Sequence, residues 1–223
     1  MNDQTVFVID DDQETRDSVV AQAKSMGLAA KEFQTAETFL EFYENQPGCL
    51  VTAYRMPGMN GLELQETLIE QGSSIPTIIV TAFARTPLTV QAIKNGAVTM
   101  LDKPCDEDKL WQAIRTALAQ DEENRERNQA EQEARERLGS LNENEENVLK
   151  LLLEGSSNKA MAQELSVSLR TIENRRRKIF MKMGVDSVAE LVAMVLRVRY
   201  ASQGWNPSNN SVEPSKSRTA SAP

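Results

Sequence analysis

Residues 49–61 read CLVTAYRMPGMNG and indicate the fold class, because an apolar strand runs directly into a loop rich in proline and glycine. Similar apolar runs recur along the first 120 residues, and segments with helical periodicity alternate with them. The alternation predicts an α/β domain with a doubly wound, five-stranded parallel sheet whose two faces are both covered by helices. The predicted strands are residues 5–9, 29–33, 49–54, 77–80 and 98–101, and the predicted helices are residues 13–26, 36–43, 61–70, 87–95 and 107–119.

Polar side chains gather where the predicted strands end. Asp10 and Asp11 follow the first strand, Thr81 follows the fourth and Lys103 the fifth, whereas Ala53 stands near the end of the third. The carboxyl ends of parallel strands share one edge of a sheet, and ligands bind there, so these positions predict a single pocket. Adjacent carboxylates suit a hard cation such as Mg²⁺. Each residue taken alone is explained equally well as part of a loop or of a helix cap.

In their order and spacing these residues resemble the phosphoacceptor pocket of a response-regulator receiver domain, in the FixJ branch of the FixJ/NarL/LuxR family. The resemblance implies a flavodoxin-like fold, with Asp10 and Asp11 as the acidic pair that shares Mg²⁺. It also implies that Thr81 and Lys103 would bind phosphoryl oxygens. The residue two before the arginine of R-M-P-G-M is the aspartate that takes the phosphoryl group in the family. Here that residue is Ala53, whose methyl group can neither attack phosphorus nor bind a phosphate.

A second departure from the family pattern lies at Met100, where receivers usually carry an aromatic ring that rotates on phosphorylation. Methionine is flexible and has no ring. We therefore expect a degenerate receiver that is not phosphorylated, and an alanine engineered into position 53 is the alternative. With one carboxylate missing, Asp10 and Asp11 are expected to bind Mg²⁺ only weakly, and no cofactor is required. Lys103 is expected to form a salt bridge with the remaining acidic pair.

The chain changes character after residue 120. Residues 121–139 are almost entirely polar, with acidic and basic side chains at i,i+4 spacing, which predicts a charged helical linker. A coiled coil is the weaker alternative, because no apolar a/d seam repeats. We assign residues 1–120 to the receiver, 121–139 to the linker, 140–200 to a helical domain and 201–223, rich in Ser, Asn and Pro, to a disordered tail.

The helical domain is basic within an acidic chain. The whole chain has a formal net charge of −8, yet residues 140–200 contain 10 basic and 8 acidic side chains, and this asymmetry suggests contact with nucleic acid. Capping signals and glycines predict four helices, of which residues 168–183, SLRTIENRRRKIFMKM, form the basic one. Leu169, Ile172 and Ile179 share its apolar face, and a solvated amphipathic helix is the alternative.

Residues 141–192 resemble the LuxR-type helix-turn-helix, with S-N-K-A-M-A-Q-E-L as scaffold helix and the basic segment as recognition helix. Double-stranded DNA is therefore the expected partner. Arginine suits guanine, asparagine suits adenine and glutamate accepts from cytosine, although Glu173 and Arg177 at i,i+4 spacing can instead orient each other. The resemblance places base contacts at Glu173, Asn174 and Arg177, and phosphate contacts at Lys159, Thr171, Arg175 and Lys182.

The sequence also argues against several classes of function. With no histidine, no activated nucleophile and no glycine-rich phosphate loop, an enzyme is not expected, and interaction with a histidine kinase is doubtful. The two cysteines lack metal-site spacing and are expected to be reduced thiols. No signal peptide or membrane span is apparent, so we expect a cytoplasmic protein.

The leading hypothesis is a DNA-binding transcriptional regulator whose receiver acts without phosphorylation as an interaction or dimerisation module. The alternative is a dominant-negative partner of an intact response regulator that drives no promoter itself. We expect a homodimer through the receiver, the C-terminal helix or both. Val188, Leu191, Val192 and Val195 form the expected dimer surface of that helix, although part of this face could pack inward.

Overall fold

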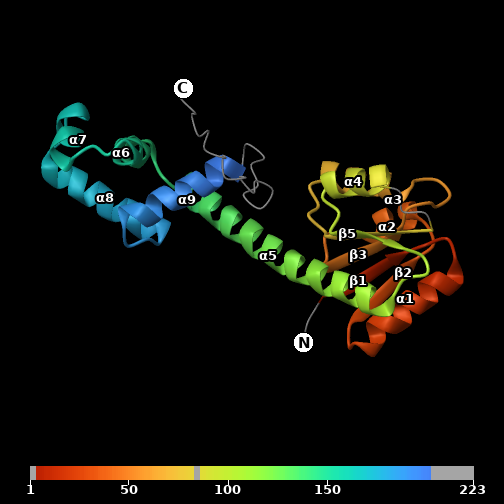
Figure 1. Cartoon of the computed structure of the whole chain (residues 1–223). Helices are drawn as coiled ribbons and strands as arrows, with labels where there is room; N and C mark the ends of the chain where they lie inside the picture. The colour runs from red at the N-terminus through yellow and green to blue at the C-terminus, as the bar shows by residue number, and fades with distance from the viewer. Residues whose placement is uncertain (1–3, 83–85, 202–223) are drawn as a thin grey trace, which may run out of the picture. The chain divides into compact units, whose positions relative to one another are not determined.

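The computed structural model in Figure 1 describes residues 4–82 and 86–201. It divides the chain into two compact units, residues 1–126 and 127–223. The expected disordered tail lies outside the described residues, apart from Ala201 at the end of the last helix. Within the described ranges no helix has the length and apolar character needed to cross a membrane.

The N-terminal unit contains the predicted five-stranded parallel sheet, with strand order β2-β1-β3-β4-β5, and the fold class is confirmed. Element boundaries differ from the prediction by one or two residues in most cases. The strands are β1 (Thr5–Ile9), β2 (Ala29–Phe33), β3 (Gly48–Ala53), β4 (Thr77–Thr81) and β5 (Thr99–Asp102), and the helices are α1 (Gln13–Ser25), α2 (Ala36–Phe42), α3 (Gly61–Glu70), α4 (Thr86–Lys94) and α5 (Glu107–Gly139).

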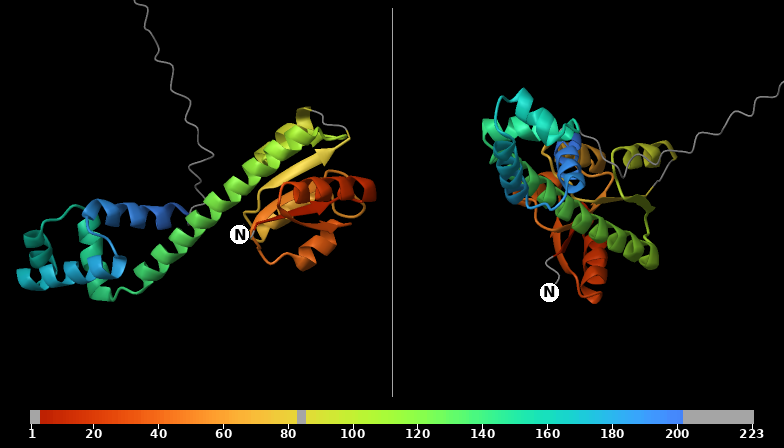
Figure 2. Two further views of the ribbon diagram at one scale, coloured as in Figure 1. Left: turned by 90° about the horizontal axis from the view of Figure 1, so that it is seen from below. Right: turned by 90° about the vertical axis from the view of Figure 1, so that its left-hand side faces the viewer.

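Helices cover both faces of this sheet (Figure 2). On one face, alternate strand residues such as Val8 and Val51 form a buried cluster with Ile114 of α5. On the other face, Phe7 and Leu50 pack against residues of α2 and α3. Successive side chains of a strand point to opposite faces of the sheet. The two clusters therefore show which face each strand residue points to.

Helix α5 continues through the predicted boundary between receiver and linker. A helix of residues 107–119 followed by a separate linker was expected, but α5 is one helix of 33 residues. Asp121 is 1% exposed and accepts hydrogen bonds from the backbone N–H of Gly48, at 2.8 Å, and from Arg125 Nε. Arg125 Nη2 also donates to the Gln46 carbonyl at 2.7 Å. The first residues assigned to the linker are therefore anchored in the N-terminal unit.

The C-terminal unit contains the four predicted helices around one apolar core, which is built largely from Leu, Ile, Val and Met side chains. Asn142 forms a capping box with Glu145, Ser168 caps α8, and Gly184 ends α8 in the left-handed conformation at φ 63°. The helices are α6 (Glu143–Leu153), α7 (Asn158–Glu164), α8 (Leu169–Met183) and α9 (Val188–Ala201).

Two predictions about apolar faces were wrong in part. Leu169 was placed on the buried face of α8, but it is 48% exposed because it begins the helix beyond the core. On α9, Leu191 and Val195 belong to the core of their own unit and cannot form a dimer surface. Val188 and Leu196 of that helix remain exposed.

Candidate functional site

The polar residues predicted from the strand ends lie at one edge of the sheet. Ala53 and Thr81 are the last residues of the neighbouring strands β3 and β4, and both are buried. Asp10 directly follows β1, and Lys103 follows β5. The backbone N–H of Lys103 donates to the Thr81 carbonyl at 2.7 Å, which holds the start of the β5–α5 loop against β4.

A buried ion pair occupies this edge. The ammonium of Lys103 donates to Asp10 Oδ2, and the Asp10 side chain is 4% exposed. Asp10 Oδ1 also accepts from the backbone N–H of Asp12 at 3.1 Å, so both carboxylate oxygens have partners. The buried guanidinium of Arg16 donates to the Asp10 backbone carbonyl. A carboxylate that is taken out of water in this way depends on Lys103 for charge compensation.

The donor set does not fit a typical Mg²⁺ site. Asp10 is engaged by Lys103, Asp11 is exposed, and Ala53 offers no oxygen from its side chain. Asp12 instead caps α1 through its bond to the Thr15 N–H at 2.7 Å, and this hydrogen bond lowers the pKa of Asp12. Among the described residues no group of three or more His, Cys, Asp or Glu is placed to hold a metal ion.

The residues beside Ala53 cannot take its place. Thr52 is buried on the opposite face of β3, where its hydroxyl donates to the Ala53 carbonyl at 3.2 Å. Tyr54 packs against the cluster that contains Met100. A Cβ at Gly61 would lie 2.4 Å from the Ala53 carbonyl oxygen, so α3 begins in direct contact with the strand end. None of Thr52, Tyr54 and Gly61 therefore offers a carboxylate in place of the one that Ala53 lacks.

Met100 fills the buried space beneath α4. It is 9% exposed and packs with Leu62, Ile79 and Ala92, and its sulfur accepts a hydrogen bond from the Thr89 hydroxyl at 3.5 Å. Because the thioether is held in this cluster, Met100 has a packing role.

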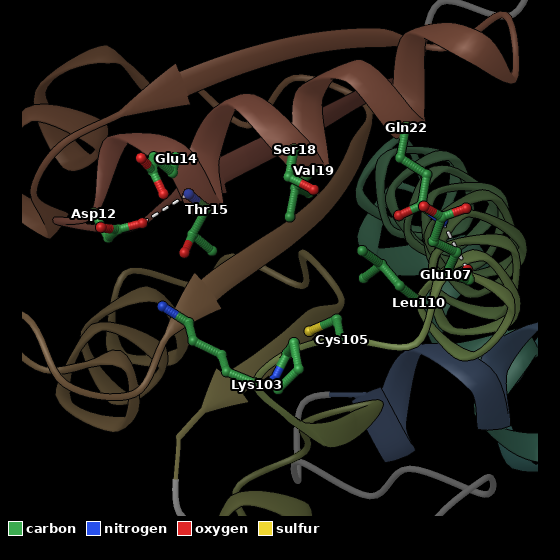
Figure 3. A pocket seen from close by; sticks show the side chains of 11 residues that line it. Asp12, Glu14, Thr15, Ser18, Val19, Gln22, Lys103, Cys105, Glu107 and Leu110 are labelled. Carbon is green, nitrogen blue, oxygen red and sulfur yellow. Dashed lines mark hydrogen bonds between the residues drawn. The ribbon is translucent and has the colours of Figure 1, made fainter.

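A cavity of about 500 Å³ lies beside the ion pair, between α1 and the start of α5. Figure 3 shows Lys103 and Cys105 on one side of it and Thr15 and Val19 of α1 on the other. Burial raises the pKa of the Cys105 thiol above its ordinary value. Both cysteines are free, as the sequence predicted, and burial raises the pKa of Cys49 as well.

The exposed face of α8 presents polar side chains that are free to bind a ligand. Within the described residues, Glu173, Asn174 and Arg177 are exposed and take part in no hydrogen bond or ion pair of their side chains. The alternative in which Glu173 and Arg177 pair with each other is therefore not what the structure contains. Thr171 differs, because its hydroxyl lies 2.8 Å from that of the capping residue Ser168.

The cations of α8 do not all face solvent. Arg176 donates to the Asn158 side chain and so connects α8 to the first residue of α7. This bond could not be predicted from the sequence, since it depends on the packing of two helices. Lys159, at the start of α7, and Arg175 have no such partner among the described residues, and they remain predicted phosphate contacts.

Lys182 has a structural role that the sequence did not indicate. Its ammonium donates to Glu145 Oε2 at 2.6 Å and to the Ser140 carbonyl at 2.9 Å. The Glu145 side chain is 4% exposed, and the hydrogen bond from Lys182 lowers its pKa. Lys182 therefore neutralises a buried carboxylate of α6, and its predicted contact with phosphate stays a prediction.

Replacing Lys182 with methionine is expected to destabilise the C-terminal unit by about 1–2 kcal/mol, since the pair is partly exposed to solvent. Because folding lowers the pKa of Glu145 from its ordinary value of 4.5, this stabilisation is fully present above that pH and is lost as the pH falls through the lowered pKa. Amide exchange of α6 and α8, corrected for the intrinsic exchange rate and followed from pH 7 downward through the acid range, measures the loss of this stabilisation. Lys150→Met, which removes an exposed charge of α6, is the control; equal effects of both variants would contradict the prediction.

Known proteins resemble the chain over both units. Residues 6–115 match the family described as "Response regulator receiver domain", and residues 139–195 match "Bacterial regulatory proteins, luxR family". The transcriptional regulatory protein FixJ of Azorhizobium caulinodans is 38% identical over 192 residues, covering 86% of this chain and 91% of that protein. The response regulator protein TmoT of Ectopseudomonas mendocina is 37% identical over 202 residues, covering 89% and 92%.

Solved structures agree with these matches. A low-resolution structure of the response regulator StyR has a TM-score of 0.78 and 38% identity, and the match covers 87% of this chain and 99% of StyR. Full-length FixJ from B. japonicum has a TM-score of 0.54 and 36% identity, covering 89% and 98%. The chain therefore belongs to the FixJ-like response regulators, a family of DNA-binding transcriptional regulators in which a receiver domain is joined to a LuxR-type domain.

Proposed function

We propose that the chain binds specific DNA sequences through α8 and regulates transcription without phosphorylation of its receiver. The observation that carries the DNA-binding part is the set of exposed, unpaired side chains of Glu173, Asn174 and Arg177 along one face of α8. These residue types can each read a base edge in a major groove. The cations Lys159 of α7 and Arg175 of α8 are proposed to supply contacts to phosphates.

The receiver part of the proposal rests on the edge of the sheet. By the resemblance, Ala53 stands at the position of the family's phosphoacceptor, and Lys103 is paired with Asp10. Lys103 would have to leave a buried carboxylate in order to bind a phosphoryl group. In the proposed receiver the Asp10–Lys103 ion pair therefore stays in place, and Mg²⁺ binds weakly at most. The receiver does not accept a phosphoryl group from a histidine kinase.

The full-length protein is expected to remain unmodified after incubation with acetyl phosphate and Mg²⁺, because no carboxylate stands at the end of β3. Intact mass spectrometry at neutral pH checks this, with hydroxylamine trapping to detect acyl phosphates. Ala53→Asp is the matched variant that returns a nucleophile to the position. Recovery of an acyl phosphate from the native chain would refute the proposal of a phosphorylation-independent receiver.

We further propose that the regulator acts as a homodimer. Val90 and Ile93 of α4 are each 47% exposed, and Val188 and Leu196 of α9 are also exposed, so both units offer apolar side chains for a second copy. Sedimentation of the full chain and of Val90→Asp and Leu196→Asp variants would identify which helix contributes.

A mobility-shift experiment with the full chain tests DNA binding directly. A duplex recovered from a random pool should bind more tightly than a scrambled duplex of equal composition, and affinity should fall steeply with salt. Loss of any preference between the two duplexes would favour the alternative, in which the chain acts only by associating with an intact response regulator.

A further inference from the structure

The C-terminal end of the recognition helix α8 is held by residues that precede the helix-turn-helix. Arg137, in the last turns of α5, donates from Nη1 to the Met183 carbonyl at 2.8 Å. Met183 is the last residue of α8, and carbonyls at this position have no partner within their own helix. A guanidinium here both satisfies the carbonyl and lies at the negative end of the helix dipole.

The turn after α8 leaves room for this guanidinium. Gly184 has φ 63°, which favours glycine, and its N–H returns to the last turn of α8. A Cβ at Gly184 would lie 2.8 Å from Arg137 Nη1. The absence of a side chain at Gly184 thus serves two purposes: it permits the backbone turn and lets Arg137 reach Met183.

Lys182 fastens the same end of α8 on a second side. Its bonds to the Ser140 carbonyl and to Glu145 reach the α5–α6 junction, which lies three residues beyond Arg137. We use the name C-terminal clamp for Arg137, Ser140, Glu145 and the two α8 residues that they hold, Lys182 and Met183. Each member of the clamp lies in the C-terminal unit.

Arg137 lies outside both family matches, which end at residue 115 and resume at residue 139. The residue that holds the recognition helix therefore belongs to the connecting helix α5 and not to the matched LuxR-type segment. Within the described residues, the only ion-pair partner of Arg137 is Glu133, at 3.8 Å. Both side chains of that pair are more than 40% exposed. An exposed pair of this kind contributes little, so the bond to Met183 is the more important contact.

We propose that Arg137 is a positioning residue for DNA recognition: through the C-terminal clamp it fixes the orientation of α8, so that the exposed side chains of Arg177 and Asn174 meet base edges in register. The inference rests on the DNA binding proposed above and goes beyond it, because it assigns a role in sequence selectivity to a residue that touches no DNA. Hydrogen bonds to bases depend on direction and distance, whereas attraction to phosphates tolerates small rotations.

The experiment compares the native full chain with Arg137→Met, which keeps an unbranched apolar side chain but cannot donate. Affinity is measured for a duplex recovered by in vitro selection with the native chain and for a scrambled duplex of the same composition. We expect affinity for the selected duplex to fall roughly tenfold, as for a lost charged hydrogen bond. Affinity for the scrambled duplex should change no more than it does in Arg135→Ala, which removes one exposed cation of the same helix. Arg137→Lys should restore most of the selectivity.

Amide exchange of residues 180–185 provides a readout that does not depend on DNA. Arg137→Met should exchange faster there, and unchanged exchange would overturn the clamp itself. Faster exchange with unchanged selectivity, an equal loss of affinity for both duplexes, or failure of Arg137→Lys to rescue would each overturn the positioning role. If the native chain selects no sequence at all, the proposed function fails, whereas the exchange measurement still decides the clamp.

Discussion

Replacing Lys103 with methionine is expected to lower the free energy of unfolding of the receiver by about 2–3 kcal/mol. Removing one partner of a buried ion pair leaves the other charge uncompensated, which costs about 3–5 kcal/mol where both groups are fully buried. The Asp10 side chain is 4% exposed and that of Lys103 24%, so the expected cost lies somewhat below this range. Denaturant unfolding of the full chain, followed by amide exchange of β1 and β5, measures the loss.

Two variants isolate the charge effect at Lys103. Lys109→Met removes an exposed cation from α5 and should change stability by less than about 0.5 kcal/mol. Combining Lys103→Met with Asp10→Asn should recover part of the lost stability, since residue 10 then carries no charge that Lys103 would have to compensate. If Lys103→Met proved as stable as the native chain, the ion pair between Asp10 and Lys103 would not contribute to the stability of the receiver.

Arg177→Ala is expected to relax sequence preference, with a loss of about 1–3 kcal/mol for the preferred base pair, which is the range for a good bidentate contact. Arg177 is exposed and free of ion pairs in the described part of the chain, so truncation breaks no internal ion pair. Selection from a random pool, repeated with native and variant chains, should show one position of the recovered motif losing its preference.

Lys159→Ala separates a base contact from a phosphate contact. It should weaken binding to all duplexes by a similar factor and reduce the salt dependence, while leaving the recovered motif unchanged. An unaltered motif for Arg177→Ala would remove its assignment to a base edge.

Much of the fold could be predicted because local pattern and tertiary burial agree. The central strands β1, β3 and β4 are nearly continuous apolar runs, and Asn142, Ser168 and Gly184 mark helix ends through local backbone chemistry. The end of the receiver could not be found in this way. Asp121 and Arg125 look like solvated linker residues, and only the loop that contains Gly48 makes Asp121 a buried anchor.

Some contacts of the candidate sites could likewise be predicted from the sequence, and others could not. Sequence placed Asp10 and Lys103 at one sheet edge, because the ends of parallel strands must meet there. It could not show that Lys182 is directed toward Glu145, since the i,i+3 and i,i+4 rules describe one helix at a time and this pair joins two. For a similar reason the sequence left open which part of α9 packs inward, because an apolar stripe does not show whether it faces its own core or another copy.

The two cysteine thiols of the receiver differ in accessibility, so their alkylation can be used to follow the opening of the sheet. Cys49 lies at 0% exposure in the cluster between the sheet and α1, and burial raises its pKa, so the reactive thiolate is scarce in the native state. Cys105 borders an open cavity. An alkylating reagent should therefore label Cys105 first, and the slower appearance of a second adduct would time the opening of the sheet without any added probe.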